Sequence, residues 1–298
     1  MNTLSSSSRS ARQPLVAAGA VAFTIVSWAS AFPFIRIGLH GLAPLQLAAA
    51  RFATAAVLVI AWLAWRRPAK PSTRDALRFL VCGFLGIALY NALLNTGEQT
   101  VSAGAASFIV NTLPIFTALL AAVFLHERFN RWGWLGSLIS LAGIAVIAHG
   151  QPGGLVLGSG STLILGAALC SASYFVLQRR LIPAYGALPC AAYTLLAGAL
   201  LLTPWLPGAL VSLGGTSHDT TLAVLVLGVF PAALGYATWT VALGHFGAAR
   251  AANFLYLTPA VATALSMMLT GEQPGIETVC GGLLAIAGVI VVAFRERT

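Results

Sequence analysis

Side chains that could perform catalysis or bind metals are scattered along this chain. The five histidines show no i, i+3 or i, i+4 clustering and no two cysteines form a Cys-x-x-Cys pair, whereas metal sites and acid–base pairs on helices need such spacings. The chain has no Gly-x-Ser-x-Gly motif, and Gly158-Ser159-Gly160-Ser161 lacks the Gly-Lys ending of a phosphate-binding loop. We therefore expect that the protein is not an enzyme and that it binds neither a metal nor a cofactor. The residues concerned are His40, His126, His149, His218, His245, Cys82, Cys170, Cys190 and Cys280.

The composition indicates a membrane environment. Of the 298 residues, 58% are hydrophobic and only 8% are charged, and the mean hydropathy is +0.89. Soluble domains carry roughly 25% charged residues. At roughly 20–25 apolar residues per helix, a chain of this length fits about ten membrane spans. The expected fold class is an all-α integral membrane protein, in which the cysteines serve as small packing residues.

Charges, prolines and glycines divide the apolar runs. We expect residues 1–14 to form a disordered cytoplasmic tail and residues 295–298 to form a second short tail. The first apolar run is too long for the hydrophobic region of a signal peptide and leads directly into further spans, so it is expected to be an uncleaved first helix. The expected transmembrane helices are residues 15–38, 42–65, 76–97, 101–125, 131–149, 158–179, 189–206, 221–244, 248–270 and 275–294.

The basic residues predict how these helices cross the membrane. A net charge of +9 would suggest nucleic-acid binding in a soluble protein, but here the basic residues flank apolar runs. If the N-terminus is cytoplasmic, nearly all of them lie inside, whereas the outer turns hold Asp219, Glu272 and Glu277. The positive-inside rule then predicts two cytoplasmic termini, with membrane lipids and no nucleic acid as partners. The inner basic residues are Arg9, Arg12, Arg66, Arg67, Lys70, Arg74, Arg78, Arg128, Arg131, Arg179, Arg180, Arg250, Arg295 and Arg297.

The chain contains an internal repeat. An offset of 145 residues places a proline, a glutamate and two glycines of the first half on identical residues of the second half. The repeats span residues 15–149 and 158–294, joined by the Gly-rich linker 150–157. Because each holds five expected helices, an odd number, the second copy is inverted, as in secondary transporters that work by alternating access. The matched pairs are Pro114 and Pro259, Glu127 and Glu272, Gly136 and Gly281, and Gly143 and Gly288.

These matched residues resemble those of a known family. The first copy reads Leu113-Pro114 … His126-Glu127-Arg128 … Gly136 … Gly143, and the second reads Thr258-Pro259 … Gly271-Glu272 … Gly281 … Gly288. In these features roughly residues 15–294 resemble the EamA-type transporters of the drug/metabolite transporter superfamily. Within it the chain looks most like the bacterial inner-membrane exporters of aromatic amino acids, the YddG type. The second copy departs from the first in having Gln273-Pro274 where the first has Arg128-Phe129.

The resemblance implies export of aromatic and other neutral amino acids across the bacterial inner membrane, along a path lined by the third, fourth, eighth and ninth helices. Aromatic and polar residues lie near the expected midpoints of these helices and of the first helix. Flat rings with amide and hydroxyl groups suit a substrate with an apolar body and a small polar end. The alternative is that they fill space and form hydrogen bonds between helices. The candidate substrate-binding residues are Trp28, Tyr90, Asn91, Asn111, Tyr236, Trp239, Asn253 and Tyr256.

Arg51 is an unusual charge, because the rise of an α-helix places it roughly 10 Å below the outer surface. An arginine at the centre of a span costs about 2.5–3.5 kcal/mol, so Arg51 should have a partner or a function. Glu98, at the outer end of the third helix, is one possible partner, and a substrate carboxylate is another. Instead of binding substrate, Arg51 could extend its charged end to the membrane surface or form a purely structural pair with Glu98. The same choice applies to Arg36, for which a surface charge is favoured.

Several absences and small residues complete the prediction. No aspartate or glutamate lies at the centre of an expected span, so we expect facilitated transport rather than tight proton coupling. Pro114 and Pro259 are expected mid-helix, where each removes a backbone hydrogen bond and forms either a hinge or a static kink. Small residues on the fifth and tenth helices favour close packing within one monomer. The alternative function is efflux of apolar drugs or other small metabolites, with or without proton coupling.

Overall fold

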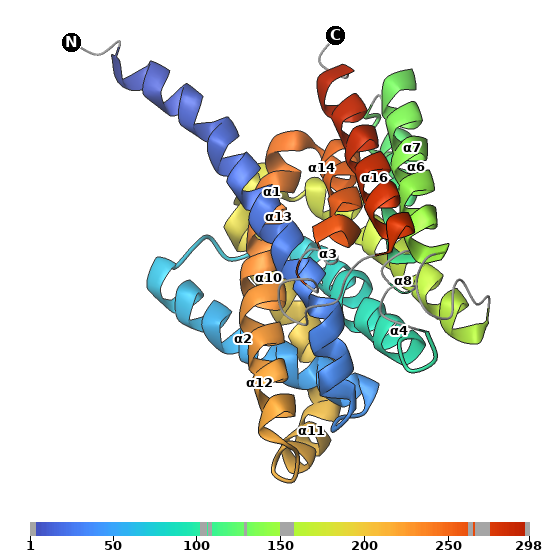
Figure 1. Cartoon of the computed structure of the whole chain (residues 1–298). Helices are drawn as coiled ribbons and strands as arrows, with labels where there is room; N and C mark the ends of the chain where they lie inside the picture. The colour runs from blue at the N-terminus through green and yellow to red at the C-terminus, as the bar shows by residue number, and fades with distance from the viewer. Residues whose placement is uncertain are drawn as a thin grey trace.

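Helices account for nearly all of the residues that the structure describes (Figure 1). The structure is a computed structural model and describes residues 4–101, 106, 109–127, 130–149, 158–261, 265 and 275–295. These ranges contain no β-strand. Six helical stretches within them are long and apolar enough to cross a membrane: residues 14–39, 44–66, 73–97, 159–179, 187–213 and 218–246.

In the first half, two long helices are followed by a third whose winding changes midway. Proline at the first position of the second helix is favourable, because the N–H that it lacks would have no partner there. The elements are α1 (Leu4–Leu39), α2 (Pro44–Arg66), α3 (Thr73–Gly83), the π-helix η1 (Phe84–Leu89), α4 (Tyr90–Gly97), α6 (Leu113–Phe124) and α7 (Arg131–His149).

Among the described residues the second half repeats this order, with additional short helices after its first and second long helices. Its elements are α8 (Ser159–Arg179), the short α9 (Ile182–Tyr185), α10 (Ala187–Leu202), the 3₁₀-helix η2 (Thr203–Trp205), α11 (Leu206–Leu213), α12 (His218–Leu227), the π-helix η3 (Gly228–Leu234), α13 (Gly235–Phe246), α14 (Ala248–Phe254), the 3₁₀-helix η4 (Leu255–Leu257) and α16 (Ile276–Arg295).

Some boundaries differ from those expected. Helix α1 begins at Leu4, because adding residues to a helix that already exists is far easier than starting one; the disordered tail of residues 1–14 stays a prediction. The expected helix 189–206 extends through η2 and α11 to Leu213. The linker 150–157, Glu272 and residues 296–298 lie outside the described residues.

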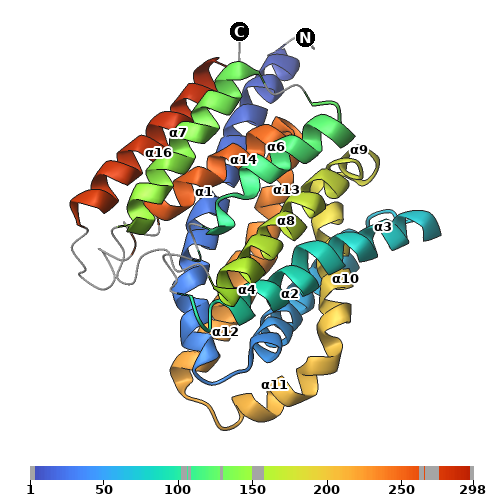
Figure 2. The same cartoon turned by 90° about the vertical axis from the view of Figure 1, so that its right-hand side faces the viewer.

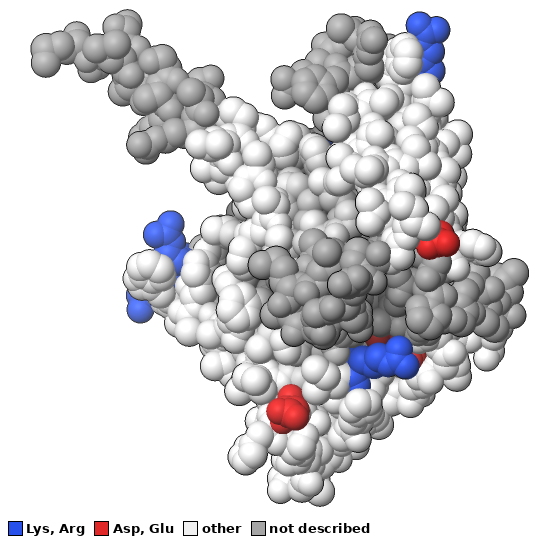
Figure 3. Space-filling model, viewed as in Figure 1, with Lys and Arg blue, Asp and Glu red and all other residues white. Residues whose placement is uncertain are grey.

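Large hydrophobic side chains cover the outside of the molecule. Val57, Val211 and Leu283 expose 68%, 81% and 64% of their surface, and soluble monomers rarely expose wide apolar areas. Figure 3 shows one face on which charged side chains are few and separated by broad uncharged areas. Such a surface is suited to contact with lipid.

The two π-helices occupy equivalent positions in the two halves. The offset of 145 residues moves η1 onto residues 229–234, which lie inside η3. π-Helices are rare, and those that do occur are often found at functional sites. The repeat therefore includes an irregularity of the backbone as well as matching side chains.

The fourth helix of each half is interrupted directly before its proline. Asn111 and Thr112 form a turn ahead of α6, and η4 precedes the helical segment that begins at Thr258. Pro114 and Pro259 therefore lie in the first turn of a new helix rather than mid-helix, which corrects the expectation. Proline is favoured there because the first N–H groups of a helix have no partner to lose. Their action as hinges stays a prediction.

The fifth helices of the two halves, α7 and α16, lie side by side in both views (Figures 1 and 2). A Cβ added to Gly136 would lie 2.6 Å from the carbonyl oxygen of Gly288, and one added to Gly143 would lie 2.5 Å from that of Gly281. Residue numbers thus rise along α7 as they fall along α16, so the helices are antiparallel. Ser140 donates a hydrogen bond of 3.0 Å to the carbonyl of Ala285, the residue exactly one repeat later.

Glu127 joins the two halves directly. Its carboxylate accepts hydrogen bonds of 3.1 Å from the backbone N–H groups of Ala248 and Ala249 at the start of α14, and it lies 3.9 Å from Nε of Arg179. The first N–H groups of a helix have no partner within the helix, so the carboxylate satisfies them and complements the helix dipole.

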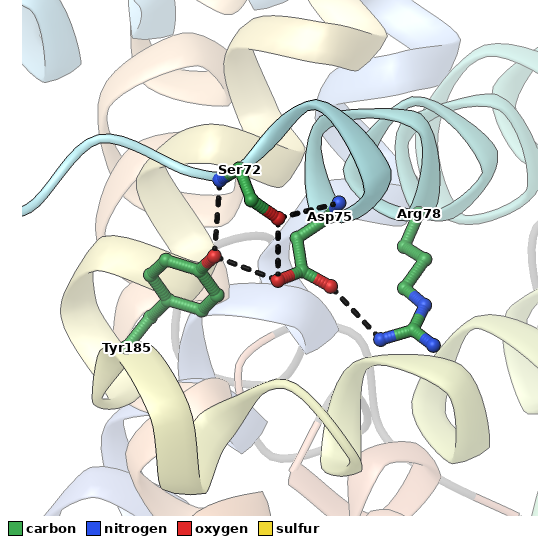
Figure 4. A network of polar contacts seen from close by, with 4 residues as sticks. All are labelled: Ser72, Asp75, Arg78 and Tyr185. Atoms are coloured by element: carbon green, nitrogen blue, oxygen red, sulfur yellow. Dashed lines mark hydrogen bonds and ion pairs between the residues drawn. The ribbon is translucent and has the colours of Figure 1, made fainter.

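A second polar network joins α3 to α9 (Figure 4). The Ser72 hydroxyl caps α3 by accepting a hydrogen bond from the Asp75 N–H, and Asp75 forms an ion pair of 2.8 Å with Arg78. The Tyr185 hydroxyl donates to Asp75 at 2.8 Å. Since Tyr185 belongs to the second half, this network also holds the halves together.

Close packing of α7 on α16 predicts a marked effect of one methyl group. In Gly288→Ala, the new Cβ would lie 2.2 Å from Ser140 Oγ and 2.4 Å from the Gly136 carbonyl, so we expect a loss of about 1–3 kcal/mol. Gly282→Ala on the same helix is the control, because its Cβ would meet only Ala260, at 3.8 Å. The measurement is thermal unfolding in detergent. Equal stability of the two variants would contradict the packing.

Candidate functional site

A cavity lies between the two halves and encloses about 730 Å³ of empty space, the solvent at its opening included. Its wall combines aromatic rings, aliphatic side chains and a single charged side chain. The residues lining it are Trp28, Ala31, Phe32 and Ile35 of α1, Arg51 of α2, Tyr90 and Leu94 of α4, Val110, Asn111, Leu113 and Pro114 around the start of α6, Ser171, Tyr174 and Phe175 of α8, Tyr236 of α13, and Leu255 and Thr258 beside η4.

The cavity lies at the irregular parts of the helices. Asn111 and Pro114 border it on either side of the break before α6, and Leu255 and Thr258 do so at the corresponding break in the second half. Discontinuous helices are the usual place of substrate sites in transporters with inverted repeats, because unwound backbone is tolerated where it lines a cavity.

The carbonyls of the two π-helices hold two aromatic residues of the wall. The Tyr236 hydroxyl donates to the Gly86 carbonyl of η1 at 2.7 Å, and Trp28 Nε1 donates to the Pro231 carbonyl of η3 at 3.1 Å. Gly86 and Pro231 are separated by the repeat offset of 145 residues, and each donor belongs to the half opposite its acceptor. The two π-helices thus position equivalent sides of the cavity.

Two glycines let aromatic rings of the cavity wall approach the backbone closely. A Cβ on Gly86 would lie 2.4 Å from the ring of Tyr174, and one on Gly235 would lie 2.7 Å from Nε1 of Trp28. Real Cβ atoms essentially never come within 3.0 Å of another group. The aromatic wall therefore depends on glycine at these two positions.

Of the residues proposed from the sequence, several meet at this wall and others do not. Substrate contact by the wall residues stays a prediction, because no substrate is present. Trp28, Arg51, Tyr90, Asn111, Pro114 and Tyr236 line the cavity, whereas Asn91, Trp239, Asn253, Tyr256, Glu98 and Pro259 are not among the lining residues.

Asn91 and Trp239 lie behind the wall and support it. Asn91 accepts a hydrogen bond of 3.1 Å from Nη1 of Arg51 and donates one of 2.8 Å to the Ile87 carbonyl. The ring of Trp239 lies 5.4 Å from that of Trp28 and 4.3 Å from that of Phe175. Both residues thus fix the orientation of side chains that border the cavity.

Asn253 and Tyr256 face a different neighbour. Asn253 accepts a hydrogen bond of 2.9 Å from Ser137 of α7, and the fully buried Tyr256 belongs to a cluster with Ile144 of α7 and Val289 of α16. Leu255 and Thr258, which border the cavity, alternate along the chain with Asn253 and Tyr256, so the latter two face away from it. Their role in the structure is to attach that helix to α7 and α16.

Sequence reasoning missed the contribution of α8. Tyr174 and Phe175 line the cavity, and the indole of Trp28 stacks on the Phe175 ring with centroids 6.4 Å apart. One signal was available, because Phe32 and Phe175 match in the internal repeat when the spacing changes by two residues. Both of these phenylalanines lie on the cavity wall.

Comparison with known proteins identifies the family. The sequence profile of the EamA-like transporter family matches residues 16–149 and again residues 158–294. The chain belongs to the EamA-like transporter family. The family resemblance seen in the sequence is thereby confirmed, and the family and the relatives are named as transporters.

Several relatives cover nearly the whole chain. A protein named "Uncharacterized transporter YdfC" from Bacillus subtilis is 38% identical over 88% of this chain and 86% of its own length. A "Probable terminal-alkyne amino-acid exporter" from Streptantibioticus cattleyicolor is 34% identical over 93% of both chains. The inner membrane transporter YedA of Escherichia coli is 31% identical over 94% of this chain and 92% of its own length.

A solved crystal structure shares the fold. It superposes with a TM-score of 0.76 over 96% of this chain and 98% of its own, at 20% sequence identity. At this level of identity the likeness concerns the fold alone.

The hydrogen bond between Tyr236 and the Gly86 carbonyl predicts the effect of removing one hydroxyl. Tyr236→Phe leaves this carbonyl without its partner from α13 in a buried site, so we expect a loss of about 1–3 kcal/mol in unfolding free energy. Tyr193→Phe is the control, because its hydroxyl also donates to a carbonyl, that of Ala69, but at an exposed site where water can replace it. Thermal unfolding measures both; an equal loss would contradict the importance of the π-helical carbonyl.

Proposed function

We propose that this protein is a facilitative exporter of aromatic and other neutral amino acids that works by alternating access at the central cavity. The observation that carries the proposal is the cavity itself. It lies between the two halves, at the breaks of their fourth helices, and combines an aromatic wall with one cationic side chain. The aromatic rings suit the apolar side chain of an amino acid, and the cationic group suits its polar end.

Alternating access rests on the proposed architecture of ten helices in two inverted repeats. The antiparallel α7 and α16 support it, since Gly136 approaches Gly288 while Gly143 approaches Gly281. The repeat offset exchanges the members of these two contacts, as a two-fold axis between the halves requires. The hydrogen bond between Ser140 and Ala285 lies where that axis would pass.

We further propose that the protein lies in the bacterial inner membrane with both termini in the cytoplasm. The distribution of arginines favours this orientation. The first described residue of α1 and the last of α16 lie toward the same end of the molecule (Figures 1 and 2). A relative is named as an inner membrane transporter. One chain contains both halves of the proposed path, so a monomer suffices.

Amino acids are favoured as substrates by the chemistry of the wall and by the relative named as an amino-acid exporter. The alternative is efflux of apolar drugs or other small metabolites, which the rings of Trp28, Tyr174 and Phe175 would also accept. Arg51 favours the first proposal, because an apolar drug offers nothing to a buried guanidinium. We propose facilitated transport rather than tight proton coupling because no aspartate or glutamate lies at the centre of an expected span.

Transport by proteoliposomes tests this function. We expect saturable uptake of phenylalanine, tryptophan and leucine, with initial rates that do not change when a pH gradient is collapsed. Trp28→Ala should weaken apparent affinity about 2- to 10-fold, because an aromatic contact contributes about 0.5–1.5 kcal/mol. Trp205→Ala, at a partly exposed position in η2, is the matched control and should leave uptake unchanged.

Each outcome of the transport experiment has a distinct meaning. A large fall in rate on collapse of the pH gradient would refute facilitated transport. Absence of uptake for every amino acid, together with export of apolar drugs, would favour the alternative.

Reporter fusions test the proposed orientation. Green fluorescent protein fused to the C-terminus should fluoresce and alkaline phosphatase fused at the same place should be inactive, because the first reporter matures in the cytoplasm and the second only outside it. A reversed pattern would contradict the positive-inside assignment.

A further inference from the structure

An arginine and a glutamate are buried near the cavity without forming an ion pair with each other. Arg51 of α2 is 5% exposed and Glu98, which follows α4, is 4% exposed. In the described ranges the ion pairs within 4.0 Å are Asp75 with Arg78 and Glu127 with Arg179. Arg51 and Glu98 therefore do not form the direct structural pair that the sequence allowed.

Both groups also lack hydrogen bonds that they could form. The Arg51 guanidinium donates through Nη1 to Asn91, but its Nε has no partner among the described residues. Neither carboxylate oxygen of Glu98 accepts a hydrogen bond from that part of the chain. A buried charge without a partner is costly, and a structure tolerates it where a ligand or a function provides the compensation.

Arg51 lines the cavity, and Glu98 lies one helical turn beyond a lining residue. Arg51, Tyr90 and Leu94 line the cavity, and Glu98 lies four residues after Leu94, so it falls on the same face of this helix, one turn farther out. Arg36 of α1 acts electrostatically on Glu98 more strongly than Arg51 does, but it is exposed and forms none of the described ion pairs.

The arrangement matches the chemistry of one class of molecule. An α-amino acid at neutral pH carries a carboxylate and an ammonium group on the same carbon, with its side chain on a third bond. Arg51 offers donors to the carboxylate, and Glu98 offers acceptors to the ammonium group. The stacked rings of Trp28 and Phe175 offer an apolar surface to the side chain.

We propose that Arg51 and Glu98 are the two charged poles of the substrate site and bind the carboxylate and the ammonium group of a zwitterionic amino acid. This inference rests on the proposed function and makes it more specific. Asn91 acts as a positioning residue, because its hydrogen bond holds the guanidinium at the wall. A substrate bound in this way satisfies both buried charges at once.

Titration calorimetry with the purified protein tests the two poles separately. The probes are L-phenylalanine, phenethylamine, which lacks the carboxylate, and 3-phenylpropanoate, which lacks the ammonium group. Arg51→Gln should weaken phenylalanine and phenylpropanoate about 10- to 100-fold and leave phenethylamine within about threefold. Glu98→Gln should weaken phenylalanine and phenethylamine to the same extent and spare phenylpropanoate.

Matched controls separate these effects from general damage. Arg78→Gln and Glu277→Gln make the same chemical changes at exposed positions and should leave all three dissociation constants unchanged. Retained binding of phenethylamine by Arg51→Gln demonstrates that the variant folds. Arg51→Lys keeps the charge but loses the planar guanidinium. It should therefore give an intermediate loss of affinity for phenylalanine and phenylpropanoate, the two probes with a carboxylate, and none for phenethylamine.

The outcomes that overturn the inference differ from those that overturn the function. Equal weakening of all three probes by either variant, or wild-type binding by both variants, would refute the assignment of the poles while leaving an amino-acid site intact. Failure of the unmodified protein to bind or transport any amino acid would instead refute the proposed function, and the poles with it.

Discussion

Hydrocarbon offers no hydrogen-bond partners, so backbone groups that leave the regular helical pattern inside a membrane must be satisfied by the protein itself. This constraint links the helices of the transporter to its cavity. The carbonyls of Gly86 and Pro231, in the two π-helices, accept hydrogen bonds from Tyr236 and Trp28. The side chains that satisfy these backbone carbonyls thus also form the wall of the cavity. A substitution that changes the wall at these positions therefore also removes a hydrogen bond from a π-helix.

The same constraint explains why small residues occur where the halves meet. Gly86 and Gly235 allow aromatic rings to contact the backbone, and Gly136 and Gly288 allow α7 and α16 to touch. Helices in a membrane gain little from the hydrophobic effect when they associate, so close packing and hydrogen bonds must supply the attraction. Glu127 adds a charged contact to the N-terminus of α14. The interface between the halves thus combines close packing, hydrogen bonds and a charged contact.

Much of the architecture could be predicted from the sequence, because apolar runs, arginines and a repeat of proline, glutamate and glycine are local patterns. The wall could be predicted only in part. Helices that are apolar all round do not indicate which face is turned inward, so Tyr174 and Phe175 of α8 were missed. For the same reason hydropathy does not show that Asn253 and Tyr256 contact α7 and α16, and substrate contact by them stays a prediction.

The two halves share a backbone plan but not the same side chains. The repeat places Asn111 opposite Tyr256 and Asn91 opposite Tyr236, and η1 has six residues where η3 has seven. In a carrier whose two end states arise when the halves exchange conformations, perfect identity would make those states equal in energy. In such a carrier, differences like those between these two halves would make the two end states unequal in energy. Such a carrier can respond to substrate at different concentrations on the two sides of the membrane, although the gradient alone still decides the direction of net flow.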